Sequence, residues 1–134
     1  MSHLQYFTYK GFGERVQKDT HYSQAVRIGN IVKISGQCGW DRLTEEIPSD
    51  IGQQVDRVFD NVEHTLRQAG GSGWEQVYQI RLYAAPFDME VTEHFIRNLR
   101  KYLPNHQPLL TGVGVAALYG GARLEVEVEA HLGE

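Results

Sequence analysis

The sequence of 134 residues has a single cysteine, Cys38, which excludes an internal disulfide framework and zinc sites built from pairs of cysteines. No apolar run approaches the roughly 20 residues that cross a membrane as a helix. The N-terminal segment also lacks the apolar stretch of a secretory signal peptide. We therefore expect a cytoplasmic protein that folds without disulfides and without a membrane partner.

Basic residues are also few. Lys and Arg total 13 against 17 Asp and Glu, a formal net charge of −4, whereas nucleic-acid-binding domains usually carry a basic excess that neutralises phosphates. The six histidines show neither His-x-x-x-His nor His-x-His spacing, so the sequence predicts no metal site. We expect no metal, no cofactor and no nucleic-acid partner, and we expect a small molecule as the ligand.

The chain does have enough apolar material for a compact core. Hydrophobic residues make up 41% of the sequence, and a chain of this length can bury about two-thirds of its unfolded surface. It contains no linker, repeat or low-complexity stretch. These features predict one domain over residues 1–134.

The pattern of apolar residues predicts the element order β-β-β-α-β-α-β-β. Apolar side chains recur at helical spacing in residues 47–69 and 90–103, which are the two predicted helices. The predicted strands are 5–9, 25–28, 31–35, 77–85, 109–118 and 122–132. This order indicates an α+β fold in which two helices cover one face of a mixed sheet. A second subunit is expected to cover the other face.

The last two predicted strands are joined at Gly120-Gly121, which we interpret as a two-residue hairpin turn. In that register three glutamates face small residues: Glu125, Glu127 and Glu129 opposite Ala116, Gly114 and Gly112. Leu110 points to the same face. Small residues leave room above a sheet for a ligand or another chain. A glutamate in such a cleft can have a raised pKa and act as a general acid or base, although all three can also simply be solvated.

Several short segments in fixed order resemble the Rid family, also called the YjgF/YER057c/UK114 family. They are Tyr22-Ser23-Gln24-Ala25-Val26, Gly29-Asn30, Ser35-Gly36-Gln37, Asp60-Asn61-Val62, Ala69-Gly70 and the last two strands. The resemblance extends from about Tyr22 to Leu132. It implies a chorismate-mutase-like α+β fold and a homotrimer with a central barrel and ligand clefts between the subunits.

The resemblance also implies an activity, the hydrolysis of reactive 2-imino or enamine acids to 2-keto acids and ammonia without cofactor or metal. In the family site a tyrosine matches Tyr22, a serine and a glycine match Ser35 and Gly36, and a glutamate of the last strand positions or activates water. That glutamate matches Glu125 or Glu127, and the run Glu-Val-Glu-Ala at 127–130 favours Glu127. Without the resemblance, Ser35 is interpreted as a turn serine at a strand end.

The chain departs from the family pattern at the arginine that binds the substrate carboxylate. The Pro-x-Arg run of the family reads Pro108-Leu109-Leu110 here. Leu110 makes the cleft more apolar and disfavours a 2-imino acid unless another cation holds the carboxylate. Arg123 and Arg81 are candidates for that cation, although each is also interpreted as a surface or subunit-contact arginine.

Two hypotheses follow for the function. In the first, the chain is a hydrolase of an imine, an enamine or a tautomerisable carbonyl compound, in which Glu127, Ser35 and Tyr22 are catalytic. The cleft would then also be lined by Gly36, Leu110, Cys38, Trp40, Glu125 and Arg123. In the second, the same cleft of a non-catalytic trimer binds a small metabolite, and the missing arginine favours this alternative.

Overall fold

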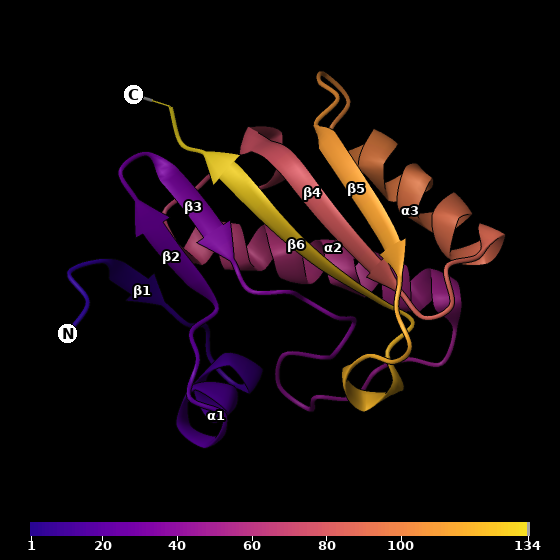
Figure 1. Cartoon of the computed structure of the whole chain (residues 1–134), viewed down its shortest axis with the longest axis horizontal. Helices are drawn as coiled ribbons and strands as arrows, with labels where there is room; N and C mark the ends of the chain where they lie inside the picture. Colours follow the sequence, from indigo (N-terminus) through magenta and orange to yellow (C-terminus); the bar gives the residue numbers. More distant parts are fainter. Residues whose placement is uncertain (134) are drawn as a thin grey trace.

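The computed structural model describes residues 1–133, which form three helices and a six-stranded sheet (Figure 1). The strands are β1 (Gln5–Phe7), β2 (Ala25–Ile28), β3 (Ile31–Ile34), β4 (Val77–Ala84), β5 (Leu109–Gly114) and β6 (Leu124–His131). The helices are α1 (Phe12–Asp19), α2 (Ile51–Gln68) and α3 (Met89–Tyr102), with short 3₁₀ turns η1 (Trp74–Gln76) and η2 (Tyr119–Gly121). Within residues 1–133 no helix has the length and apolarity needed to span a membrane.

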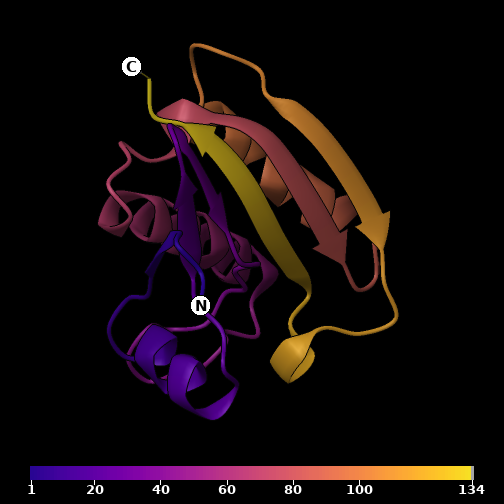
Figure 2. The same ribbon diagram turned by 60° about the vertical axis from the view of Figure 1, so that its left-hand side comes forward.

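The sheet has the strand order β1-β2-β3-β6-β4-β5. The pair β4 and β5 is parallel because α3 carries the chain back along the sheet between them, and the other neighbouring pairs are antiparallel. Both α2 and α3 cover the same face of the curved sheet (Figure 2). The predicted α+β fold with a mixed sheet and two helices on one face is therefore confirmed.

The predicted hairpin between the last two strands is wrong. The partners of β6 are β4 and β3, whereas β5 lies at the sheet edge beside β4. Gly120 and Gly121 do have positive φ angles of 62° and 73°, but they belong to η2, within a connection that passes the end of β4. Glu127 therefore lies opposite Arg81, and Leu110 lies beside the buried Ile80 on the helix-covered side.

The helix α1 was not predicted, because residues 12–19 fall in a segment that the sequence pattern assigns to strand and turn. The helix is short and amphipathic, with Phe12 and Val16 buried and Glu14 and Lys18 exposed. Gly11 is the N-cap residue of this helix, with a φ of 77°. Figure 1 shows α1 below the sheet, apart from α2 and α3.

The core lies between the sheet and the helices α2 and α3. Alternate residues of the two central strands are buried there: Ile80, Leu82 and Ala84 of β4, and Leu124, Val126 and Val128 of β6. On α2, Phe59 stacks on Trp74 with ring centres 4.6 Å apart. Each large apolar side chain stabilises the fold by about 1.5–3 kcal/mol when it is fully buried. The same alternation leaves the glutamates of β6 on the uncovered face.

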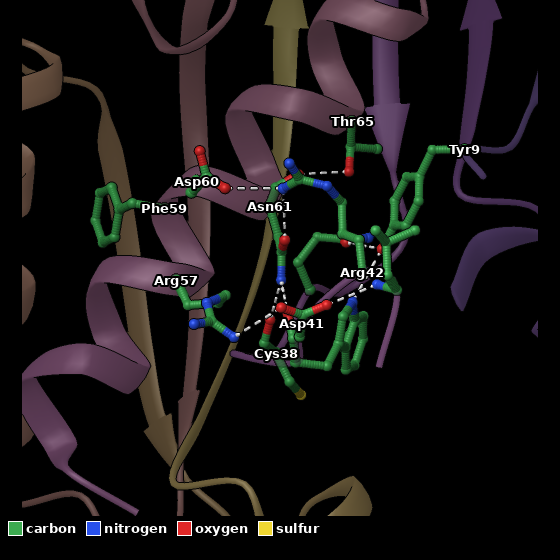
Figure 3. Close-up of polar contacts among 12 residues, drawn as sticks. Tyr9, Cys38, Asp41, Arg42, Arg57, Phe59, Asp60, Asn61 and Thr65 are labelled. Atoms are coloured by element: carbon green, nitrogen blue, oxygen red, sulfur yellow. Dashed lines mark hydrogen bonds and ion pairs between the residues drawn. The ribbon is translucent and has the colours of Figure 1, made fainter. Parts of the chain in front are cut away.

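Asn61, in the middle of α2, ties that helix to the segment that follows β3 (Figure 3). Its amide Nδ2 donates to the carbonyl oxygens of Cys38 and Trp40, both at 2.9 Å. Its Oδ1 accepts from Arg42 at 2.9 Å, and the same Arg42 nitrogen donates to Asp60 at 2.8 Å. Because Asn61 is completely buried, water cannot replace these bonds. The backbone of Cys38 and Trp40 is thereby fixed.

We expect Asn61→Ala to lower the free energy of unfolding by about 3 kcal/mol, because it leaves two buried carbonyl oxygens without donors. Urea unfolding monitored by fluorescence measures this change. Gln53→Ala, at an exposed position of the same helix, is the control and should change the value by at most about 0.5 kcal/mol. Equal stability of the two variants would contradict the role given to Asn61.

Candidate functional site

A cavity of about 150 Å³ lies where α1 and η2 meet the end of the sheet, with room for about five water molecules. We call it the α1 pocket. Its lining comes from four separate parts of the chain: Phe12, Arg15, Val16, Thr20, Tyr22, Gly36, Cys38, Trp40, Tyr119 and Glu125. The rings of Phe12 and Trp40 stack at 3.8 Å and join α1 to the pocket wall. The size suits a small molecule of a few heavy atoms.

The wall that contains Gly36 and Cys38 is held by the residue between them. The backbone N–H of Gln37 donates to the carbonyl of Val126 at 2.8 Å, and the N–H of Val126 donates to the carbonyl of Gln37 at 3.0 Å. The Gln37 side chain accepts from the hydroxyl of Tyr9 at 2.8 Å, and that hydroxyl accepts from the indole of Trp40 at 3.0 Å. This buried network fixes the wall in the absence of a ligand.

Glu125 supplies the carboxyl group of the α1 pocket. It lies against Gly36 so closely that a Cβ atom at position 36 would overlap the carboxylate. Within residues 1–133 the structure gives this carboxyl no hydrogen bond or ion pair. Burial, and after it the negative charge of Glu127, raise the pKa of Glu125 above its usual value. A half-buried, unpaired carboxyl with a raised pKa is suited to proton transfer.

The other two glutamates of β6 have partners. Glu127 accepts a hydrogen bond from the hydroxyl of Tyr83. Glu129 accepts from the hydroxyl of Tyr78 at 2.8 Å and from Arg81 at 3.2 Å. Burial opposes ionisation of Glu129, but these two donors outweigh it and hold the pKa of Glu129 below its usual value. Of the three glutamates predicted as candidates, Glu125 is thus the one left free for a ligand.

Two shallower hollows adjoin the α1 pocket on the open face of the sheet. The wider one, of about 810 Å³, is lined by Tyr22, Ser35 and Glu127 among others. The narrower one, of about 320 Å³, is lined by Gly36, Glu125 and Glu127 among others. Because the lining residues are shared, the three hollows are neighbours. The structure therefore brings Tyr22, Gly36 and Glu125 together in the α1 pocket and places Ser35 and Glu127 beside it.

The remaining predicted site residues divide into two groups. Cys38 and Trp40 line the α1 pocket, whereas Leu110 lines a separate hollow between β5 and α3. Arg123 donates to Asp88 at 2.8 Å and to the carbonyl of Ala85 at 2.9 Å, away from the pocket. Within one chain, neither Leu110 nor Arg123 contributes to the site around Glu125.

The Cys38 thiol and the Tyr22 hydroxyl of the pocket both have raised pKa values and favour their neutral forms. Burial raises the pKa of the Cys38 thiol far above its ordinary range, so Cys38 is a wall residue and not a thiolate nucleophile. Burial also raises the pKa of Tyr22, which remains a hydrogen-bond donor. Ser35 donates its hydroxyl proton to the carbonyl of Ser23 at 2.7 Å. Residues 1–133 contain no cluster of three His, Cys, Asp or Glu side chains placed to hold a metal ion.

Sequence reasoning missed five lining residues, Phe12, Arg15, Val16, Thr20 and Tyr119. The first three belong to α1 and Thr20 follows it, and the helical spacing of Phe12 and Val16 between Gly11 and Thr20 was the available signal. Tyr119 precedes the two glycines of η2. Its position follows only from the path of the connection between β5 and β6, which local sequence does not reveal.

Comparison with known proteins places the chain among relatives of one family. Residues 12–132 match the family model described as Endoribonuclease L-PSP. The mitochondrial protein MMF1 of Saccharomyces cerevisiae is 30% identical over 109 residues, which are 81% of this chain and 73% of that protein. A 2-iminobutanoate/2-iminopropanoate deaminase of Dermatophagoides farinae is 29% identical over 107 residues, 79% of this chain and 81% of that protein. Because one relative is mitochondrial, the cytoplasmic location stays a prediction.

Two solved structures have the same fold. The crystal structure of yeast Mmf1 matches with a TM-score of 0.76 and 26% identity, covering 99% of this chain and 96% of that one. The structure of a Rid family protein from Yersinia pestis matches with a TM-score of 0.74 and 27% identity, covering 82% of this chain and 86% of that one.

The raised pKa of Glu125 predicts a pH dependence of stability. The folded state binds more protons than the unfolded state between the ordinary carboxyl pKa of 4.5 and the raised value. This contribution to stability is complete below the ordinary pKa and is lost as the pH rises through the raised one. Glu125→Gln removes the ionisation, so we expect its Tm to exceed that of the wild type at about pH 8 and to match it at about pH 4.

Differential scanning calorimetry across this pH range measures the effect. The control is Glu93→Gln, at an exposed position of α3, which should give a Tm difference that does not change with pH. A Glu125→Gln variant that is less stable than the wild type at high pH would contradict the environment assigned to this carboxyl.

Proposed function

The chain belongs to the Endoribonuclease L-PSP family, also known as the Rid or YjgF family, and from this premise we propose that it is a cofactor-free hydrolase of small reactive imines or enamines. The unpaired, half-buried carboxyl of Glu125 in the α1 pocket carries the proposal. A relative that is 29% identical is named 2-iminobutanoate/2-iminopropanoate deaminase. A small substrate is also favoured over RNA by the net charge of −4, since phosphate chains bind to basic surfaces.

Hydrolysis of an imine needs one group that both removes and returns protons. The Glu125 carboxylate takes a proton from water as the water oxygen bonds to the imine carbon and the C=N electron pair moves to nitrogen. The resulting carboxylic acid protonates that nitrogen, which gives a carbinolamine and restores the carboxylate. The carboxylate then takes the hydroxyl proton of the carbinolamine and returns it to nitrogen as the C–N bond breaks, so that ammonia leaves and the carbon becomes a carbonyl. Imine and water are thereby converted into a carbonyl compound and ammonia, and Glu125 is regenerated. A raised pKa favours the second half of this cycle.

The neighbours of Glu125 support these steps. Gly36 has no side chain, which leaves the carboxyl open to the cavity, and the Tyr22 hydroxyl is a neutral donor in the same pocket. Ser35 and Glu127 line the adjacent hollow and already have partners in the chain. We therefore assign the acid–base role to Glu125 rather than to Glu127, and we assign Tyr22 to substrate binding.

We expect Glu125→Gln to reduce imine hydrolysis by about 100-fold or more, because the amide can neither accept nor return the proton. Glu127→Gln is the matched control on the same strand and should retain activity within a few-fold. The assay generates 2-iminobutanoate and neutral imines in situ and follows their decay with and without protein. If Glu127→Gln is the inactive variant, the assignment is reversed. If the wild type accelerates no imine, a non-catalytic metabolite-binding role replaces the proposal.

The assembly we propose is a homotrimer, in which a second copy covers β5. The strand β5 lies at the edge of the sheet (Figure 1), and every residue of it is exposed. Leu109 and Val113 of this strand, and the nearby Phe87, are exposed apolar side chains. Open apolar edges of this kind are normally covered by another chain, because unpaired backbone groups and apolar side chains favour association. In such an assembly the hollow beside Glu127 would be completed by a neighbouring subunit.

We expect light scattering to give three times the mass of one chain for the wild type, and a lower mass for Val113→Lys, because the new charge opposes burial of the β5 edge. Leu43→Lys, at another exposed apolar residue far along the chain, is the control and should leave the trimer intact. A monomeric wild type at micromolar concentration would refute the proposed assembly.

A further inference from the structure

Arg15 is the cationic residue among those that line the α1 pocket in residues 1–133. Its Nε donates to both carboxylate oxygens of Glu45, at 2.8 and 2.7 Å, and its Nη2 donates to the hydroxyl of Tyr119 at 3.2 Å. The guanidinium carbon lies 5.6 Å from the centre of the Phe12 ring. These contacts from three directions position the side chain before any ligand arrives, which lowers the entropy lost on binding.

The partner of Arg15 is itself held in a defined place. Glu45 has a φ of 69°, a left-handed conformation that costs a residue with a side chain about 1–2 kcal/mol. The loop is closed by backbone hydrogen bonds at 2.8 Å from the N–H of Glu45 to the carbonyl of Asp41 and from the N–H of Asp41 to the carbonyl of Glu46. Strained residues that the surrounding structure maintains concentrate at functional sites.

The contacts of Arg15 use only part of its hydrogen-bonding capacity. Both Glu45 oxygens bond to the Nε corner, and Asp19 lies 3.6 Å from Nη1, beyond hydrogen-bond distance. Most of the edge formed by Nη1 and Nη2 is therefore available, apart from one bond to the hydroxyl of Tyr119. This edge is the one on which a guanidinium binds a carboxylate with two parallel hydrogen bonds.

We propose that Arg15 is the carboxylate-binding residue of the α1 pocket, so that the substrates are small 2-imino acids whose carboxylate is held from α1 and not from β5. The other candidate arginines are engaged elsewhere, Arg81 with Glu129 and Arg123 with Asp88. The hydrolysis of 2-imino acids rests on the proposed function, whereas the binding of a small carboxylic acid by Arg15 does not require turnover. Arg15 would thus supply from α1 the cation that β5 lacks at Leu110.

The charges around Arg15 set how tightly the pocket binds an acid. Glu45 and, more distantly, Asp19 offset the positive charge of the guanidinium, so an incoming carboxylate competes with Glu45. Glu125, which also lines the pocket, repels an anion less when it is protonated. Removing the charge of Glu45 should therefore strengthen acid binding, whereas removing Arg15 should weaken it. A purely structural ion pair would make both changes act in the same direction.

The test measures binding of 2-oxobutanoate and of its uncharged amide by calorimetry, on the full chain and without turnover. We expect Arg15→Gln to weaken 2-oxobutanoate binding by 10-fold or more and amide binding by less than 2-fold. Glu45→Gln should tighten 2-oxobutanoate binding several-fold and leave the amide unchanged. Lys18→Gln, which removes an exposed charge of the same helix outside the pocket, should change neither.

Three outcomes would overturn the proposal: equal effects of Arg15→Gln and Lys18→Gln, weaker acid binding by Glu45→Gln, or a parallel loss of acid and amide binding in Arg15→Gln. A kinetic arm separates this proposal from the proposed function. If 2-oxobutanoate binds through Arg15 but no imine is hydrolysed, the hydrolase assignment fails and the carboxylate site stands. If imines are hydrolysed and Arg15→Gln leaves the KM for 2-iminobutanoate unchanged, the carboxylate site fails alone.

Discussion

Two backbone hydrogen bonds between Gln37 and Val126 hold the segment after β3 against β6. This contact positions the residues on either side of it that line the α1 pocket, Gly36, Cys38 and Glu125. The segment has already left the sheet at Ile34 and returns to it for this single residue pair. Next to this bridge, Gly36 lies against the carboxylate of Glu125. The side chain of Gln37 points the other way, into the buried network with Tyr9. This bridge thus holds Glu125 and the pocket wall of Gly36 and Cys38 next to each other.

The strand β6 shows how the fold accommodates an unpaired carboxyl. Its inward side chains, Leu124, Val126 and Val128, are buried in the core, and each contributes about 1.5–3 kcal/mol. A buried carboxyl without a partner costs about 1–3 kcal/mol, which one such side chain can offset. Glu127 avoids that cost through its bond with Tyr83. Because side chains alternate along the strand, one face of β6 contributes to the core and the other carries the glutamates. Among those glutamates, Glu125 is the one whose carboxyl is left without a partner.

Local patterns in the sequence predicted the elements that depend on neighbouring residues. The helical spacing around Phe59 and the alternation from Leu124 to Ala130 gave α2 and the glutamate face of β6 correctly. The pairing of β5 with β4 was not predictable in this way, because the connection through Gly120 looks like a hairpin turn whichever strand lies beside it. Hence the prediction that small residues lie opposite the glutamates was wrong. The assignment of the acid–base role to Glu125 or to Glu127 also depends on Tyr83, which is distant in the sequence. Tyr83 can donate to Glu127 only because β4 lies beside β6.

The helix α1 adds to this sheet a separate layer that determines what the pocket can bind. Phe12 is buried against Trp40, and this stack fixes the rotation of the helix about its axis. Residues three and four positions along a helix share a face, so Arg15 and Val16 must also face the pocket. The carboxyl of Glu125 is placed by the sheet, whereas the guanidinium is placed by a short helix and the Glu45 loop. Under the proposed function, changes in that helix would alter the choice of substrate without moving Glu125, to which we assign the proton transfer.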